Sequence, residues 1–103
     1  MKSKILGYHV HIYYHQRPSM EDFKCSFPNK KISFNDSAVG PHPSGQCLVE
    51  ITLAEYGSII EWLIRHYNRF SILIHPETDN SHDDHTSSAL WLGDPIRLDL
   101  SKL

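Results

Sequence analysis

The stretch from Gly7 to His15 reads Gly-Tyr-His-Val-His-Ile-Tyr-Tyr-His and is rich in β-branched and aromatic residues, which is typical of a β-strand. Successive side chains on a strand point to opposite faces, so this strand has two chemically different faces. One face carries the odd-numbered side chains: His9, His11, Tyr13 and His15. The other face is apolar and is predicted to meet the core: Leu6, Tyr8, Val10, Ile12 and Tyr14. The imidazole face of such a strand needs interaction partners from other parts of the chain.

The overall composition is that of one ordinary folded domain spanning residues 1–103. The chain has 40% hydrophobic and 21% charged residues, which fits a globular protein rather than a disordered one. Its net charge of −2 argues against nucleic acid or an anionic membrane as partner, and no apolar run approaches the roughly 20 residues that span a bilayer. Met1 to Lys4 are not followed by an apolar signal-peptide segment, so we expect a cytoplasmic protein with Cys25 and Cys47 reduced.

The predicted elements follow the order strand, helix, strand, strand, helix, strand. Thr52–Glu55 has the form of a capping box that opens the main helix, whose apolar stripe runs from Tyr56 through Ile64 to Tyr67. With right-handed crossovers, this order predicts an α+β, ferredoxin-like βαββαβ sandwich with a four-stranded antiparallel sheet and both helices on one face. The first and third strands would be central. Residues Ile96–Leu100 also alternate and are predicted to add a short C-terminal edge strand.

This topology gathers ionisable side chains at one end of the open face of the sheet. Loop position brings some of them there and strand alternation brings the rest: His9, His11, His42, His75, His85 and Glu50. His15 points the same way but lies at the far end of the sheet. Several neutral imidazoles and a carboxylate predict a site for a borderline divalent metal, either zinc or non-haem iron(II). A single histidine on a strand is more often hydrogen-bonded than a ligand, so this prediction depends on the whole set.

The open face is also predicted to expose apolar side chains. Leu48, Leu73 and Tyr13 would lie on it and would be left in contact with water. Exposed apolar surface of this kind usually marks an interface or a ligand cleft. We therefore expect a homodimer that packs open face against open face and covers the histidines.

Several motifs carry a family resemblance when they are taken in order. The chain reads Gly-Pro-His-Pro at 40–43, Leu-Ile-His-Pro at 73–76, Asp-Asp-His-Thr at 83–86 and Ala-Leu-Trp-Leu-Gly at 89–93. Together with the first strand, these motifs resemble the DOPA 4,5-dioxygenase family of small ring-cleaving enzymes over about Ile5 to Leu100. The resemblance implies a dimeric ferredoxin-like domain with metal-dependent extradiol activity, which opens the ring of a catechol such as DOPA with O2.

The resemblance also implies a ligand set for the metal. Its histidine motifs match His11 and His75, and we expect these two residues to be ligands. His9, His42 or Glu50 would complete the set. Iron(II) is the expected metal for an extradiol reaction, and zinc is the alternative.

The remaining matched positions are expected to act on the substrate. A neutral histidine outside the ligand set would accept the catechol proton and later return it, and we assign this role to His85, with His42 as a second catalytic residue. Tyr13 and Trp91 would line the pocket and stack on the aromatic ring. The alternative for these two aromatic residues is simple packing.

One departure from the family pattern bears on the substrate. The second strand of the family ends in an arginine and a histidine, where this chain has Ser33 and Asn35. This difference favours a catechol other than DOPA, or a loss of activity.

Three other functions compete with the dioxygenase. The first is a non-catalytic dimeric module that binds metal or a small ligand with the same histidines. The second is a structural dimer whose histidines only hydrogen-bond. The third is an RNA-binding sheet, which would need basic and aromatic residues where this chain has histidines and Glu50.

Overall fold

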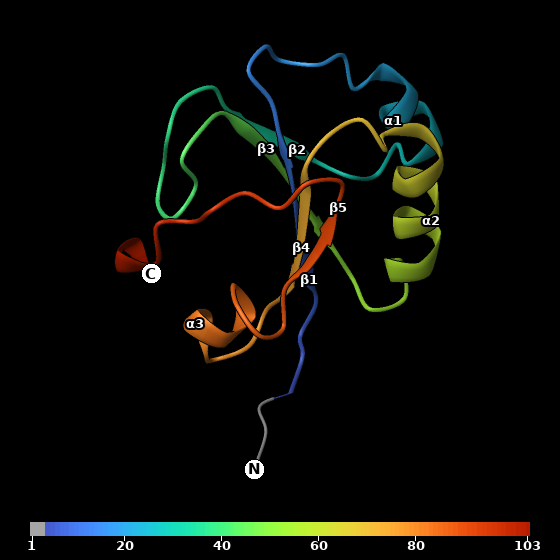
Figure 1. The fold of residues 1–103 in the computed structure, drawn as a ribbon. Coiled ribbons are helices and arrows are strands. Elements are labelled where there is room, and N and C mark those ends of the chain that lie inside the picture. Colours follow the sequence, from blue (N-terminus) through green and yellow to red (C-terminus); the bar gives the residue numbers. More distant parts are fainter. Residues whose placement is uncertain (1–3) are drawn as a thin grey trace.

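The computed structural model describes residues 4–103, so Met1, Lys2 and Ser3, on which the expected lack of a signal peptide partly rests, lie outside the described residues. The elements follow in the order β1 (Tyr8–Tyr13), α1 (Glu21–Ser26), β2 (Ile32–Asn35), β3 (Gln46–Ile51), α2 (Tyr56–His66), β4 (Ile72–Pro76), α3 (Ser81–Asp84), β5 (Leu90–Leu92) and a 3-10 helix (Leu100–Lys102). Helices α1 and α2 lie on one side of the sheet, and α3 and the C-terminal segment lie on the other (Figure 1). None of the helices in the described part of the chain is long and apolar enough to cross a membrane.

The sheet is antiparallel throughout, with the strand order β2-β3-β1-β4-β5. The order of the first four strands confirms the predicted ferredoxin-like arrangement, with β1 and β3 inside the sheet. Because β1 is paired on both sides, His9 lies opposite Glu50 on β3 and opposite His75 on β4. The histidine face predicted for β1 therefore continues across both of its neighbours.

The extra strand is formed by different residues from those predicted. Leu90–Leu92 (β5) pairs with β4, whereas Ile96–Leu100 is irregular up to the start of the 3-10 helix. Gly93 ends β5 with a φ of 71°, and a Cβ at this position would collide with the carbonyl oxygen of Phe70. The chain then leaves the sheet, and the Asp99 N–H donates to the Pro41 carbonyl at 2.8 Å. Residues 96–100 do not form a strand because they run beside the β2–β3 connection instead of a strand edge.

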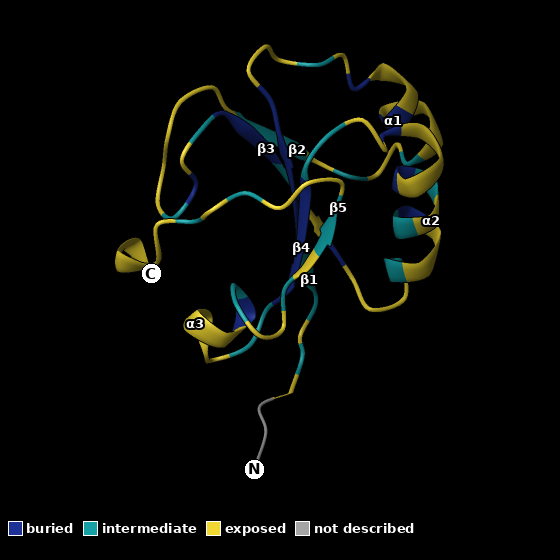
Figure 2. Ribbon diagram, viewed as in Figure 1, coloured by how far each residue is buried: buried dark blue, intermediate teal, exposed yellow. Residues whose placement is uncertain are grey.

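The face of the sheet covered by α1 and α2 forms the hydrophobic core (Figure 2). Its most buried side chains come from the strands and from both helices: Val10, Ile12, Phe23, Cys47, Val49, Ile59, Leu63, Ile72 and Ile74. The predicted capping box is present, because Thr52 N–H donates to Glu55 Oε1 at 2.9 Å and Glu55 N–H donates to Thr52 Oγ1 at 3.2 Å. Two predicted core residues are exposed instead: Leu6 precedes β1, and Ile64 lies about 100° around α2 from the buried Leu63.

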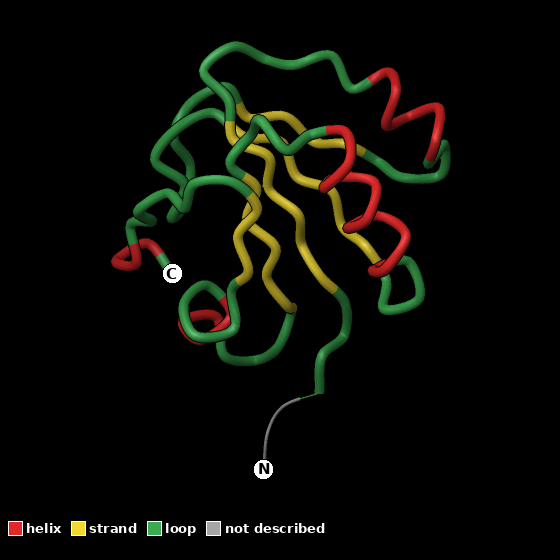
Figure 3. The backbone as a smooth tube through the Cα atoms, turned by 45° about the vertical axis from the view of Figure 1, so that its right-hand side comes forward, coloured by secondary structure: helices red, strands yellow, loops and turns green. Residues whose placement is uncertain are grey.

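The opposite face of the sheet is covered by the same chain rather than left to water. Tyr13 and Leu73 are only 4% and 0% exposed. The β2–β3 connection, α3 and the segment after β5 all lie on this side of the sheet (Figure 3). Two of the three apolar residues that motivated the predicted homodimer are therefore covered, whereas Leu48 is half-buried and borders a surface pocket with Ser33 and Glu50. The homodimer itself stays a prediction.

Candidate metal centre

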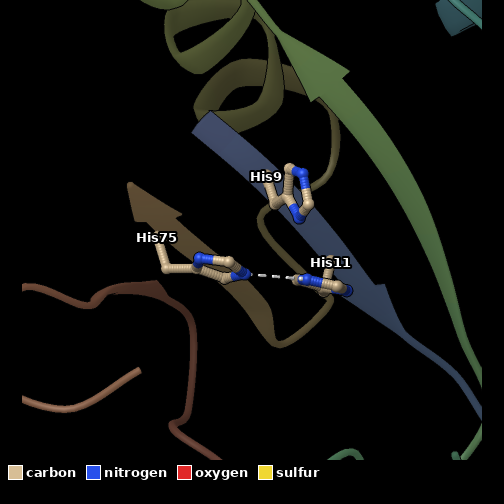
Figure 4. A group of neighbouring side chains, drawn as sticks. All are labelled: His9, His11 and His75. Atoms are coloured by element: carbon tan, nitrogen blue, oxygen red, sulfur yellow. Dashed lines mark hydrogen bonds between the residues drawn. The ribbon is translucent and has the colours of Figure 1, made fainter. Parts of the chain in front are cut away.

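Three histidines meet at the centre of the covered face. His9 and His11 come from β1 and His75 comes from β4, and one ring nitrogen of each lies within 4.8 Å of the others (Figure 4). Alternation along β1 puts His9 and His11 on the same face, and the β1–β4 register places His75 beside them. His11 and His75 are buried, whereas the side chain of His9 is 22% exposed and forms the accessible edge of the group.

Hydrogen bonds fix the orientation of the two buried rings. The Nδ1 of His11 lies 2.8 Å from Gln46 Oε1, and the Nδ1 of His75 lies 3.0 Å from the Pro76 carbonyl oxygen. Both oxygens can only accept, so each Nδ1 carries the proton and each Nε2 keeps a free lone pair. These two Nε2 atoms face each other at 3.1 Å (Figure 4). In the neutral rings no proton lies between them.

This geometry fits two ligands of one metal ion. Two nitrogens that each lie about 2.0–2.1 Å from a tetrahedral zinc are roughly 3.3 Å apart. Two facing lone pairs repel each other unless a cation or a proton lies between them. Imidazole donors suit zinc and iron alike, so the buried triad of His9, His11 and His75 could hold a divalent ion without identifying it.

Burial keeps the ring nitrogens in the state that binds metal. Burial, followed by the nearby His42 ring, lowers the pKa of His11 from 6.5 to about 2. Burial likewise lowers the pKa of His75 and of His42 to about 4. All three rings are therefore neutral at pH 7, as an imidazole ligand must be.

The carboxylates stand at the rim of the triad. Glu50, predicted as a ligand, is outside the three-residue group, and its largely exposed side chain approaches His9 Nε2 at 3.4 Å. Glu77 was not predicted, yet its Oε1 lies 3.2 Å from His9 Nδ1 and 3.6 Å from His75 Nδ1. The signal for Glu77 was available, because residues 71, 73, 75 and 77 share one parity.

His42 and His85 flank the triad from the two covering segments. The His42 ring lies 4.2 Å from that of His11, and the His85 ring lies 4.0 Å from that of His75, as measured between ring centres. The His85 Nδ1 donates to the Ser81 carbonyl at 2.7 Å, which leaves its Nε2 free. All five histidines expected at this end of the sheet are brought together. The chain places His15 elsewhere, on the exposed surface.

Tyr13 lies beside His42, and the Tyr13 ring stacks on that of Trp91 with the ring centres 5.8 Å apart. Burial raises the pKa of Tyr13, so its hydroxyl stays protonated, and this hydroxyl forms a hydrogen bond of 2.6 Å with His42 Nδ1. Tyr13 is buried against His42 and also borders a surface pocket with His15 and Arg69, while Trp91 is half-buried on β5.

A surface pocket of about 350 Å³ reaches the accessible edge of the triad. Its wall includes His9, both rim carboxylates and Lys30: Leu6, Gly7, Tyr8, His9, Lys30, Glu50, Ile51, Thr52 and Glu77. The Lys30 ammonium is held by Glu55 at 2.7 Å. A small molecule would therefore approach the histidines past His9, between two carboxylates.

Asp84 anchors the segment that carries His85. Its buried carboxylate accepts hydrogen bonds from the Thr78 N–H at 3.0 Å and from the Thr78 hydroxyl at 2.6 Å. We expect Asp84→Ala to lower the free energy of unfolding by about 1–3 kcal/mol, because both Thr78 donors lose their partner. Amide hydrogen exchange should accelerate in residues 78–88 more than in β1. Asp94→Ala, at an exposed aspartate, is the control, and identical exchange in the two variants would contradict the assignment.

Known proteins resemble this chain in sequence and in structure. The model of the Dopa 4,5-dioxygenase family matches residues 8–102. An uncharacterized 21.2 kDa protein of Botryotinia fuckeliana is 32% identical over an alignment of 113 positions that covers 92% of this chain and 62% of that protein. The DOPA 4,5-dioxygenase of Amanita muscaria is 27% identical over an alignment of 120 positions that covers 100% of this chain and 52% of that enzyme. The chain thus spans between about half and three-fifths of the length of these relatives.

A solved structure shares the fold. The crystal structure of a "putative dioxygenase" from Nostoc punctiforme superimposes with a TM-score of 0.78 at 27% sequence identity. The match covers 94% of this chain and 90% of that one. The fold of this chain therefore occurs in a second protein of similar size.

Proposed function

The chain belongs to the Dopa 4,5-dioxygenase family, and from this we propose that it is a metal-dependent extradiol dioxygenase that opens the ring of a catechol with O2. The family and the Nostoc neighbour support an oxygenase. The observation that carries the metal dependence is the pair of unprotonated Nε2 atoms of His11 and His75, 3.1 Å apart, with His9 as the third nitrogen donor. Iron(II) is the metal we propose.

The chain's own residues would divide the work as follows. His9, His11 and His75 would hold the iron, which when bound supplies the redox chemistry that lets O2 react with a catechol ring. The free Nε2 of His85 would accept a proton from the substrate. His85 would later return that proton to the ring-opened product, and His42, whose Nδ1 is hydrogen-bonded to the Tyr13 hydroxyl, would be a second catalytic residue beside the metal.

The substrate would enter by the pocket beside His9. A catechol is small enough for a pocket of about 350 Å³, the lower end of the range for ligand sites. Both rim carboxylates, Glu50 and Glu77, border this entrance, and a substrate carboxylate would be repelled by them. This charge pattern, together with Ser33 and Asn35 on β2, favours a catechol without a negative side chain over DOPA.

Reconstitution with iron tests the proposal directly. Protein purified without a histidine tag and loaded anaerobically with iron(II) should consume O2 and form a yellow ring-opened product when a catechol and air are added. Protein loaded with zinc is the matched control, because the same ligands hold a metal without redox chemistry. Wild-type protein that binds iron but consumes no O2 with catechol, 4-methylcatechol or DOPA would contradict the dioxygenase.

One observation favours a second candidate, a non-catalytic metal-binding module. His11, His42 and His75 are each less than 10% exposed, so most of the centre is closed to solvent and His9 forms its accessible edge. Stoichiometric, tight zinc binding with no O2 consumption by the iron form would identify this module.

A further inference from the structure

Gln46 is a buried amide that contacts one of the proposed ligands. We propose that Gln46 is a positioning residue of the metal centre: its side-chain oxygen holds His11 in the tautomer that offers Nε2 to the metal. This inference rests on the metal site proposed above and adds to it a residue outside the ligand set.

The position of Gln46 is rigid. It is the first residue of β3, where it pairs with Tyr13 on β1 and with Asn35 on β2. Its side chain is on the face of His11 and the residue is only 3% exposed. The Oε1 lies 2.8 Å from His11 Nδ1, which is the usual length of a good hydrogen bond. With strands on both sides, the amide has little freedom to leave the ring.

The hydrogen bond decides which nitrogen of His11 carries the proton. An amide oxygen has no proton to give, so Nδ1 must be the donor and Nε2 is left bare. In the other tautomer a proton on Nε2 would point at His75 Nε2, 3.1 Å away, and would occupy the position that a metal needs. Metal-bound histidines in proteins usually donate their second N–H to such an oxygen.

The same arrangement recurs on the neighbouring rings, but with backbone partners. The Nδ1 of His75 donates to the Pro76 carbonyl, and the Nδ1 of His85 donates to the Ser81 carbonyl. Those acceptors cannot be removed by substitution. Gln46 is the side-chain acceptor in this series, so it can be altered while the ligands stay in place.

Two substitutions at Gln46 separate positioning from packing. Gln46→Leu keeps the volume but removes the acceptor, and we expect cobalt(II) and zinc(II) to bind about 10- to 100-fold more weakly, the usual cost of losing such a partner. Gln46→Glu keeps an acceptor and should bind within a few-fold of wild type or more tightly. Affinity is measured by cobalt(II) absorbance titration with zinc competition. Gln16→Leu, at an exposed glutamine, is the matched control.

A spectroscopic readout on the unmodified protein completes the test. In the zinc-loaded wild type, two-bond ¹H–¹⁵N correlation spectra should show His11 with a protonated Nδ1 and a metal-bound Nε2. Metal bound through Nδ1 of His11 would overturn the inference even if Gln46→Leu failed to fold. Unchanged affinity in a folded Gln46→Leu would overturn it as well, while leaving the metal site intact. Wild-type protein that binds no divalent metal would remove the proposed function itself.

Discussion

Replacing both His11 and His75 by alanine should abolish tight binding of divalent metal. The two rings supply the facing Nε2 donors, and His9 alone is left as a partly exposed imidazole. We expect the loss of affinity to exceed the roughly 10- to 100-fold that removal of an outer hydrogen-bond partner costs, since two ligands disappear. The measurement is metal content after dialysis, together with a cobalt(II) titration of the metal-free protein.

The control for this prediction removes two histidines that lie outside the cluster. His15→Ala combined with His66→Ala removes exposed imidazoles at other places on the surface, and metal binding should be unchanged. Thermal unfolding of both metal-free double variants monitors the fold. Because His11 and His75 are buried, the pair His11→Gln and His75→Gln provides a second version that keeps polar, hydrogen-bonding side chains. Stoichiometric metal in a folded His11/His75 variant would place the site elsewhere.

The metal-free protein should lose stability steeply as the pH falls below 6.5. In the folded chain burial holds the pKa of His11 at about 2 and those of His42 and His75 at about 4, whereas the ordinary pKa of each, which the unfolded chain regains, is 6.5. Between pH 6.5 and pH 4 the unfolded chain therefore binds protons that the folded chain does not. The stabilisation is complete above pH 6.5 and declines as the pH falls from there toward the folded pKa values.

The expected size of this effect is large. At pH 5 each of the three histidines lowers the free energy of unfolding by about 2 kcal/mol, as follows from the pKa difference. A loss of about 6 kcal/mol is comparable to the total stability of a small domain, roughly 5–15 kcal/mol. Urea denaturation of the metal-free protein at pH 7.5, 6 and 5 measures the loss.

A single substitution checks the cause of the acid sensitivity. At pH 5 the three histidines together make the free energy of unfolding fall by about 4 kcal/mol for each pH unit of acidification. His42→Gln should reduce this dependence on pH by about a third. His15→Gln should leave the slope unchanged, because that side chain is exposed in both states. Equal stability at pH 7.5 and pH 5 would show that the buried rings take up protons without unfolding.

Local patterns accounted for most of the fold. Alternation along residues 8–13 predicted both faces of β1, and the reciprocal bonds of Thr52 and Glu55 confirm the capping box. These features involve residues only two to four positions apart in the chain. Local backbone geometry therefore makes them predictable from the sequence. The prediction of a strand at Ile96–Leu100 was wrong, because alternation of side chains does not show whether the edge of a neighbouring strand is free to pair.

The histidines of the candidate metal centre could be predicted from the sequence, but their detailed geometry and hydrogen-bond partners could not. Alternation and strand order by themselves placed His9, His11 and His75 on one face of the sheet. The β1–β4 register, the close approach of the Nε2 atoms and the holding of Nδ1 by Gln46 were decided by the tertiary structure.

The tertiary structure also decided which segments cover the histidine face of the sheet. The sequence predicted a bare face, whereas Tyr13 and Leu73 are buried within one chain, and the β2–β3 connection, α3 and the C-terminal segment lie on this side of the sheet (Figure 1). The predicted second copy stays a prediction. In a β-strand, side chains alternate between the two faces with a period of two, and this alternation can be recognised in a short stretch of sequence. Register and cover instead depend on contacts between residues that are dozens of positions apart, which no local pattern records.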